Sequence, residues 1–180
     1  MPTILMVTVT LLYPLAIWYG QGQIEPRFLA GILLLVAVTR LPVLKLSKAW
    51  QWWLGGTLLL LIFAVGANAL LPLKLYPALV NAIMFGAFSY SLIYPPSMVE
   101  RIARIREPNL PNEAIGYTRR ITVIWCIFFL VNGTIAFVTA FWASSGTWSL
   151  YNGLIAYLLM GLLFTGEYLV RLRFKARHHA

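Results

Sequence analysis

The chain has 180 residues, of which 61% are hydrophobic and only 11% are charged, yet its formal net charge is +9. A soluble domain carries charges on about a quarter of its residues, and a disordered chain lacks this much apolar surface. The composition therefore excludes both classes. It indicates an all-α, polytopic integral membrane protein that forms a single transmembrane domain over residues 1–180.

Six apolar stretches follow one another, separated by Pro, Gly and charged residues. Because the bilayer interior offers no water to the backbone, each is expected to be a helix. Pro14 interrupts the first stretch, and Arg40 and Pro42 lie near the end of the second, so these two form either full spans or a tilted, partly inserted pair. The chain then has about six spans, or five. The stretches run over 3–19, 28–44, 52–72, 76–94, 121–143 and 150–170.

The basic residues are distributed unevenly between the two sides that these spans define. Twelve of the 14 Lys and Arg residues lie near the end of the second stretch or after the second, fourth and sixth stretches, and only Arg27 and Lys74 fall on the other side. Cytoplasmic loops carry an excess of Lys and Arg, which predicts that the 95–120 loop and the basic tail 171–180 are cytoplasmic. The net charge is thus explained as a topology signal, and we expect no nucleic-acid partner.

The 95–120 loop is predicted to contain a short cytoplasmic amphipathic helix. Ser97-Met98-Val99-Glu100 has the pattern of a capping box, in which the serine side chain accepts a hydrogen bond from the backbone N–H three residues later. Glu100 and Arg104 have the i,i+4 spacing of a favourable ion pair. The apolar face of this helix would carry Met98, Ile102 and Ile105.

The arginines of this loop are candidates for contact with anionic lipid headgroups or with an acidic partner. The alternative is a plain connector whose charges serve only the topology. Pro108 and Pro111 predict an extended turn that leads back to the next span. The candidate contact residues are Arg101, Arg104, Arg106, Arg119 and Arg120.

Polar side chains within the spans form a second candidate site, because polar groups are costly in hydrocarbon. Each asparagine either forms interhelical hydrogen bonds or contacts a substrate, and Gly133 would allow two helices to approach closely beside Asn132. Glu167 is followed by Arg171 at i+4, so it either forms an ion pair or has a proton-coupling or ligand-binding role. The candidate residues are Asn68, Asn81, Asn132, Asn152 and Glu167.

Enzyme signatures are not found in the sequence, which contains no Gly-x-Ser-x-Gly, His-Glu-x-x-His or phosphate-binding glycine loop. All five acids are glutamates, which reduces the options for paired-carboxylate catalysis or a hard-metal site. The single cysteine, Cys126, excludes an internal disulfide and a thiolate zinc cluster. We therefore expect no catalytic residues, no metal and no cofactor.

The second half of the chain has a recognisable order of motifs: a proline-led basic helix, a Leu-Pro turn, a Trp…Phe-Phe span, and a Phe-Trp before a closing Trp. The motifs are Pro96-Ser97-Met98-Val99-Glu100-Arg101, Leu110-Pro111, Trp125-Cys126-Ile127-Phe128-Phe129, Asn132-Gly133, Ala140-Phe141-Trp142 and Trp148. In these residues the chain distantly resembles the bacterial intracellular septation protein A (YciB-like) family. It is more similar still to uncharacterised membrane proteins found beside aryl-polyene or fatty-acid-like biosynthesis genes.

The resemblance implies a multi-pass protein of the bacterial inner membrane with a role in envelope biogenesis or septation, in a family usually drawn with five spans. It supplies no catalytic residues. The leading hypothesis is a non-enzymatic scaffold or accessory factor that contacts lipid and other envelope-biogenesis proteins through the 97–106 helix and the face around Asn132 and Gly133. The alternatives are a small transporter or lipid-handling protein that uses the asparagines and Glu167, and a membrane enzyme acting on acyl or headgroup substrates.

Overall fold

The fold was analysed in a computed structural model of the chain. It describes the backbone of residues 50–67 and 69–178, together with eight residues of the N-terminal part (14, 18–20, 25, 28, 29 and 31). Side chains are described over the same residues except 50–54, 61, 64, 65, 67, 106 and 171–178. The predicted spans 3–19 and 28–44, and therefore the question of whether they form a tilted pair, lie outside this description.

Helices connected by short loops make up residues 50–178, and no strand occurs among the described residues. Prolines mark both limits of the helix Tyr76–Ile93. Pro77 lies in its first turn, where proline is tolerated. Pro95 and Pro96 come shortly after its end, because proline is not tolerated in a helix interior. The elements are α3 (Trp50–Ala67), α4 (Leu71–Lys74), α5 (Tyr76–Ile93), α6 (Met98–Arg106), α7 (Asn112–Trp142), α8 (Ser145–Leu150), the π-helical turn η1 (Tyr151–Ile155) and α9 (Ala156–His178).

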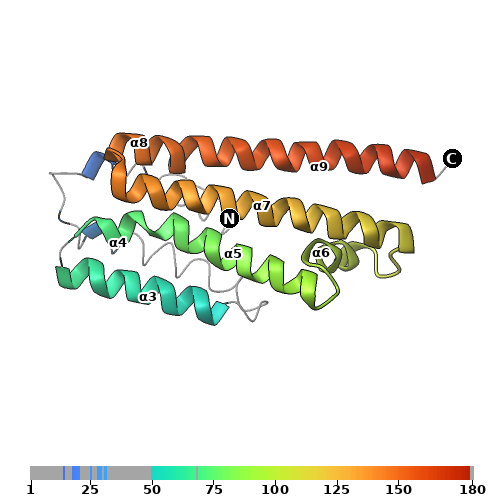
Figure 1. Ribbon diagram of the computed structural model, residues 1–180, viewed down its shortest axis with the longest axis horizontal. Coiled ribbons are helices and arrows are strands. Elements are labelled where there is room, and N and C mark those ends of the chain that lie inside the picture. Colours follow the sequence, from blue (N-terminus) through green and yellow to red (C-terminus); the bar gives the residue numbers. More distant parts are fainter. Residues whose placement is uncertain are drawn as a thin grey trace.

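The long helices α3, α5, α7 and α9 lie side by side in an antiparallel arrangement, and α8, η1 and α9 form one continuous helical stretch (Figure 1). Figure 1 places α6, the first turns of α7 and the C-terminal end of α9 at one end of the bundle, which we call the basic end. The short helices α4 and α8 lie at the opposite end. The 95–120 arginines and the basic tail therefore share one end of the bundle, as their sequence positions predicted.

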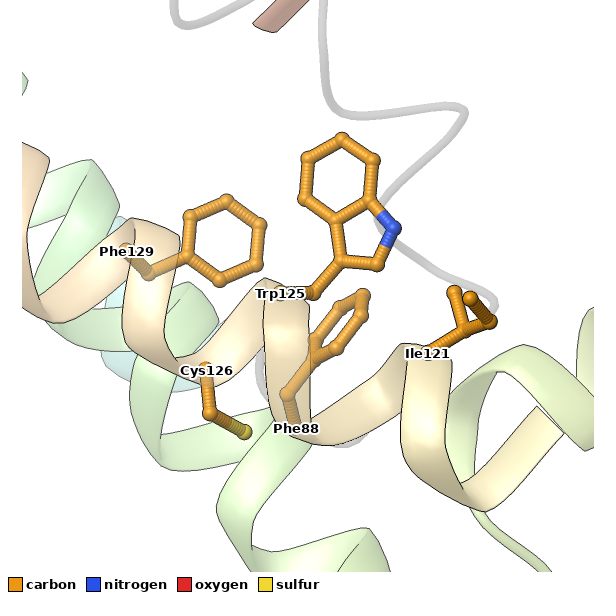
Figure 2. Packing of buried hydrophobic residues seen from close by; sticks show 5 residues of the cluster. All are labelled: Phe88, Ile121, Trp125, Cys126 and Phe129. Carbon is orange, nitrogen blue, oxygen red and sulfur yellow. The ribbon is translucent and has the colours of Figure 1, made fainter. Parts of the chain in front are cut away.

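The core lies between α5 and α7, the pair of helices with the most extensive contact. Buried residues recur along α7 at intervals of three and four, which is the spacing of one helical face. Figure 2 shows the centre of this core, where the indole ring of Trp125 lies beside the tilted rings of Phe88 and Phe129. The five residues of the cluster are Phe88, Ile121, Trp125, Cys126 and Phe129.

Three stretches of the described residues are long and apolar enough to cross a membrane: Leu71–Ile93 with 23 residues, Asn112–Trp142 with 31 and Ser145–Val170 with 26. They match the predicted spans 76–94, 121–143 and 150–170, the first two of which reach one residue past the observed helix end. Helix α3 has 18 residues and lies within the length range of a spanning helix. It accounts for most of the predicted 52–72 span. The part of the chain that the structure describes thus has helices and no strands, and it contains several stretches suited to a membrane.

One prediction about the 95–120 loop is wrong. The segment that leads to Arg119 and Arg120 is not an extended turn, because α7 begins at Asn112 and already includes both arginines. Pro111 takes the extended N-cap position, and Glu113 lies in the first turn, where a negative charge favours a helix. Hydropathy marks only the part of a helix suited to lipid, so it missed this polar extension of α7.

Candidate functional site

A chain of hydrogen bonds joins three helical segments, α5, α7 and η1, in the part of the bundle nearer to α4 and α8. The Nδ2 atom of Asn132 on α7 donates to Oδ1 of Asn81 on α5 at 3.1 Å. The hydroxyl of Tyr151 in η1 donates to Oδ1 of Asn132 at 2.9 Å. The Nδ2 atom of Asn81 donates to the backbone carbonyl of Pro77 at 2.8 Å. We call Asn81, Asn132 and Tyr151 the polar cluster; both asparagines are buried.

Gly133 brings α5 and α7 close together beside this cluster. A Cβ atom built on Gly133 would lie 2.9 Å from the Cβ of Asn81, closer than real Cβ atoms approach. The small residue therefore lets the two backbones come near enough for the asparagine side chains to bond, as small residues commonly do in membrane bundles. The close approach expected at Gly133 is present. Asn81 contacts Gly133 and Asn132 within the same chain, and a partner contact at the surrounding face of α7 stays a prediction.

The π-helical turn η1 places Tyr151 and Asn152 on the inner side of the last helix. Asn152 is buried, and its Nδ2 donates to the carbonyl of Trp148 at 2.9 Å and to the hydroxyl of Thr139 at 3.5 Å. Single-turn π-helical insertions occur often at functional sites, because they reorient side chains. Here the turn connects α9 to α7 through two polar side chains. Tyr151 was missed as a partner of the asparagines, because the sequence does not show which helix faces which.

The predicted intramembrane residues do not converge on one place. Glu167 lies sixteen residues beyond Tyr151, which is about 24 Å along a helix. Its backbone carbonyl accepts a hydrogen bond of 3.3 Å from the hydroxyl of Tyr117, in the first part of α7. Glu167 is therefore near the basic end and apart from the polar cluster. Asn68 and the side chain of Arg171, the predicted partner of Glu167, lie outside the described residues.

Helix α6 is held against the bundle by side chains of its neighbours. Ser97 occupies the N-cap position as predicted, but its side chain forms no capping hydrogen bond. Instead, the hydroxyl of Ser91 on α5 accepts from the backbone N–H of Met98 at 2.8 Å, and the hydroxyl of Thr122 on α7 accepts from that of Val99 at 3.3 Å. The capping-box prediction is wrong in this respect, because tertiary neighbours supply the acceptors.

The ion pair predicted within α6 is confirmed. Both Nε and Nη2 of Arg104 donate to Oε1 of Glu100, at 3.0 and 2.8 Å. Glu100 is buried, so this two-fold contact neutralises a carboxylate that would be costly to bury alone. The Nη1 atom of Arg104 also donates to the carbonyl of Pro108 at 3.2 Å, which connects α6 to the turn that follows it.

Two of the other candidate arginines bind backbone carbonyls at the end of α5. Arg101 donates to the carbonyls of Pro96 and Tyr94 at 2.7 and 3.2 Å, and Arg119 donates to that of Leu92 at 2.9 Å. The last carbonyls of a helix have no partners within it, and the helix dipole favours cations there. These arginines thus stabilise the turn between α5 and α6. Arg120 is exposed, and the side chain of Arg106 lies outside the description.

The apolar face of α6 points away from the bundle over most of its length. Met98 packs against the core cluster, but Ile102 is 56% exposed and Ile105 is 82% exposed. The predicted amphipathic helix is therefore present, with Val99 rather than the isoleucines packed against the core.

The tertiary cap of α6 leads to a measurable expectation. Ser91→Ala removes the acceptor for the N–H of Met98, so the first turn of α6 should open more easily. The loss of an N-cap acceptor costs about 1 kcal/mol, which should raise amide hydrogen exchange in α6 about fivefold. Ser89→Ala, also on α5, is the matched control because the hydroxyl of Ser89 donates to the Cys126 sulfur on α7, at 3.6 Å, and not to α6. Equal exchange in the two variants would show that Ser91 does not cap α6.

Lys74 is a buried charged residue, and its burial was not predicted from the sequence. Lys74, the last residue of α4, is buried, and its ammonium donates to the hydroxyl of Ser145 on α8. The indole N–H of Trp148 donates to the carbonyl of Lys74 at 3.1 Å. A charge between two strongly apolar stretches is the signal that the sequence offers for this residue, but by itself it indicates only topology.

Among the side chains that the structure describes, no three His, Cys, Asp or Glu residues are grouped so that they could hold a metal ion.

The helical bundle and its internally bonded polar groups define a helical membrane protein. The chain is similar to the inner membrane-spanning protein YciB of Erwinia tasmaniensis, with 31% identity over 96 residues, and this confirms the distant YciB-like resemblance. The matched residues make up 50% of this chain and 52% of that protein, so the chain spans about half the length of the curated relative it matches. No model of a protein family and no solved structure matches the chain.

Proposed function

We propose that this chain is a non-enzymatic scaffold or accessory factor of the bacterial inner membrane, acting in envelope biogenesis or septation. The likeness to an inner membrane-spanning protein supports the location. The observation that carries the proposal is the surface of α6. The N-terminus of this helix is hydrogen-bonded to α5 and α7, and its side chains Ile102 and Ile105 are exposed. Its partner would be another protein of the inner membrane, and the basic end would face the cytoplasm.

The fixed orientation of α6 relative to the bundle favours a protein partner over contact with lipid alone. An amphipathic helix that only rests on lipid needs no fixed position relative to the rest of the protein. Two tertiary capping bonds and the Arg101 contacts hold α6 in one orientation. Such preorganisation lowers the entropy lost when a surface binds a partner. Arg120 and Arg106, beside this surface, would add contacts to acidic groups of the partner or to anionic headgroups.

The polar cluster supports a structural role more than a transport role. The side-chain amides of Asn81, Asn132 and Asn152 each donate to a protein acceptor, and Asn81 and Asn132 also accept through their carbonyl oxygens. A transport path would instead need polar groups that face water or substrate. Glu167, which a coupled transporter would use, is separate from them along the bundle.

Photo-crosslinking in the intact membrane tests the proposal. A photoreactive amino acid replaces Ile105, which is 82% exposed, and in a second variant replaces Ile121, which is buried. We expect the Ile105 position to yield crosslinks to one or a few inner-membrane proteins, and the Ile121 position to yield none. Adducts with lipid alone at Ile105 would contradict the scaffold and leave α6 as a membrane-surface helix. A deletion strain with unchanged envelope composition would also contradict the role.

A further inference from the structure

The end of the bundle opposite the basic end contains a buried positive charge. Lys74 is 9% exposed, and its ammonium is directed to Ser145 at the start of the α8–α9 stretch. The indole of Trp148, which is fully buried, bonds to the carbonyl of the same lysine. The side chain therefore lies within the contact between α4 and α8.

The chain has few acids that could neutralise this charge. It contains five, all glutamates. Glu100 pairs with Arg104 on α6, while Glu107 and Glu113 lie next to the start of α7, at the basic end. Glu167 is beside Tyr117, also toward that end. Glu25 is exposed, and among the described residues no ion pair joins an acid to Lys74.

A buried ammonium with one hydroxyl partner is electrostatically incomplete. Removing a charge from water is costly unless an opposite charge or several hydrogen bonds compensate. Lysines near the ends of membrane helices usually extend toward the interface instead. Lys74 is held inward by Ser145, and among the described residues no glutamate lies in an ion pair with it, so an anion from outside the chain would compensate its charge.

We propose that Lys74 and Ser145 bind the phosphate group of a membrane phospholipid at this end of the bundle. Lipid phosphates lie at the level where membrane helices end, and the end opposite the basic end corresponds to the outer leaflet under the predicted topology. An ammonium binds phosphate as a compact point charge with three donors. A hydroxyl beside it adds a neutral hydrogen-bonding group without repelling the anion. The lipid would thereby join α4 to α8.

Lipid retention in native mass spectrometry tests this site. The whole chain in mild detergent is titrated with phosphatidylglycerol, with diacylglycerol (which lacks the phosphate) and with inorganic phosphate. Charge-assisted hydrogen bonds change affinity by about tenfold or more, so Lys74→Gln should weaken phosphatidylglycerol retention about tenfold. Lys175→Gln, which removes the same charge from the basic tail, should leave this binding step unchanged. Diacylglycerol should bind wild type and Lys74→Gln equally.

A thermal measurement distinguishes the site from a general loss of folding. Phosphatidylglycerol should raise the Tm of the wild type and of Lys74→Arg, which keeps the charge, but not that of Lys74→Gln. If Lys74→Gln does not fold, Ser145→Ala serves as the second variant, with a smaller expected loss. Equal phosphatidylglycerol retention by wild type and Lys74→Gln would overturn the proposal. So would the same rise in Tm with inorganic phosphate alone, which would indicate a site for a free anion.

Discussion

Trp125→Ala should produce the largest loss of stability of any single substitution considered for this chain. Trp125 is 5% exposed, and its ring lies 5.5 Å from that of Phe129 and 4.6 Å from that of Phe164, measured between centroids. Truncating a buried Trp or Phe in soluble proteins costs about 3–5 kcal/mol. Because lipid tails are as apolar as the core, only packing is lost here, and we expect about 2–3 kcal/mol.

The measurement is denaturant-induced unfolding in mild detergent, followed by circular dichroism. Trp142→Ala is the matched control, since Trp142 is on the same helix but 74% exposed, and its effect should stay within about 0.5 kcal/mol. Phe164 belongs to α9, so hydrogen exchange around it should also rise in Trp125→Ala. Similar losses in the two tryptophan variants would mean that the α5–α7 core does not limit stability.

Gly133→Ala should destabilise the protein, although alanine is the better helix former. The new Cβ would meet the Cβ of Asn81 at 2.9 Å. Both atoms are attached directly to a backbone, so the helices must separate and stretch the 3.1 Å bond between Asn132 and Asn81. Overpacking of this kind costs about 1–3 kcal/mol, which outweighs the gain in helix propensity of up to about 1 kcal/mol.

Gly116→Ala on the same helix is the control with the opposite expected sign. Nothing lies within 4 Å of a Cβ built on Gly116, so only the gain in helix propensity remains, and its free energy of unfolding should rise by up to about 1 kcal/mol. Both variants are compared in the same unfolding experiment. If Gly133→Ala were stabilised as much as Gly116→Ala, the close approach of α5 and α7 would be refuted.

Local signals predicted the elements well where proline, glycine or hydropathy punctuates the chain. The 76–94 prediction corresponds to α5 at Tyr76–Ile93 because prolines lie in its first turn and just after its end. The prediction failed at the start of α7, where Asn112 begins a polar extension that no hydropathy window detects. It also failed at the N-terminus of α6, since the capping hydroxyl of Ser91 comes from another helix.

The sequence predicts which residues belong to the candidate site, but it does not predict which of them contact one another. Polar side chains in apolar stretches identified Asn81 and Asn132 as costly groups that need partners. That they bond to each other, across 51 residues, and to Tyr151 depends on which helix faces which. The same applies to Lys74, whose burial follows from Trp148 and Ser145 on a helix more than 70 residues later.

The sequence alone determined that this is a helical membrane protein with its basic residues gathered toward one side. Backbone hydrogen bonding in hydrocarbon leaves few alternatives to helices, and apolar length and charge position are properties of the chain itself. Only the tertiary structure decided how the few polar and charged groups are used. In the tertiary structure, Asn81 and Asn132 hydrogen-bond to each other within the polar cluster. Ser91 and Thr122 accept hydrogen bonds from the N-terminus of α6, and Lys74 is buried far from the glutamates of the basic end. The reason is physical: the cost of a polar group in a membrane is local, but the partner that compensates it is supplied by another helix.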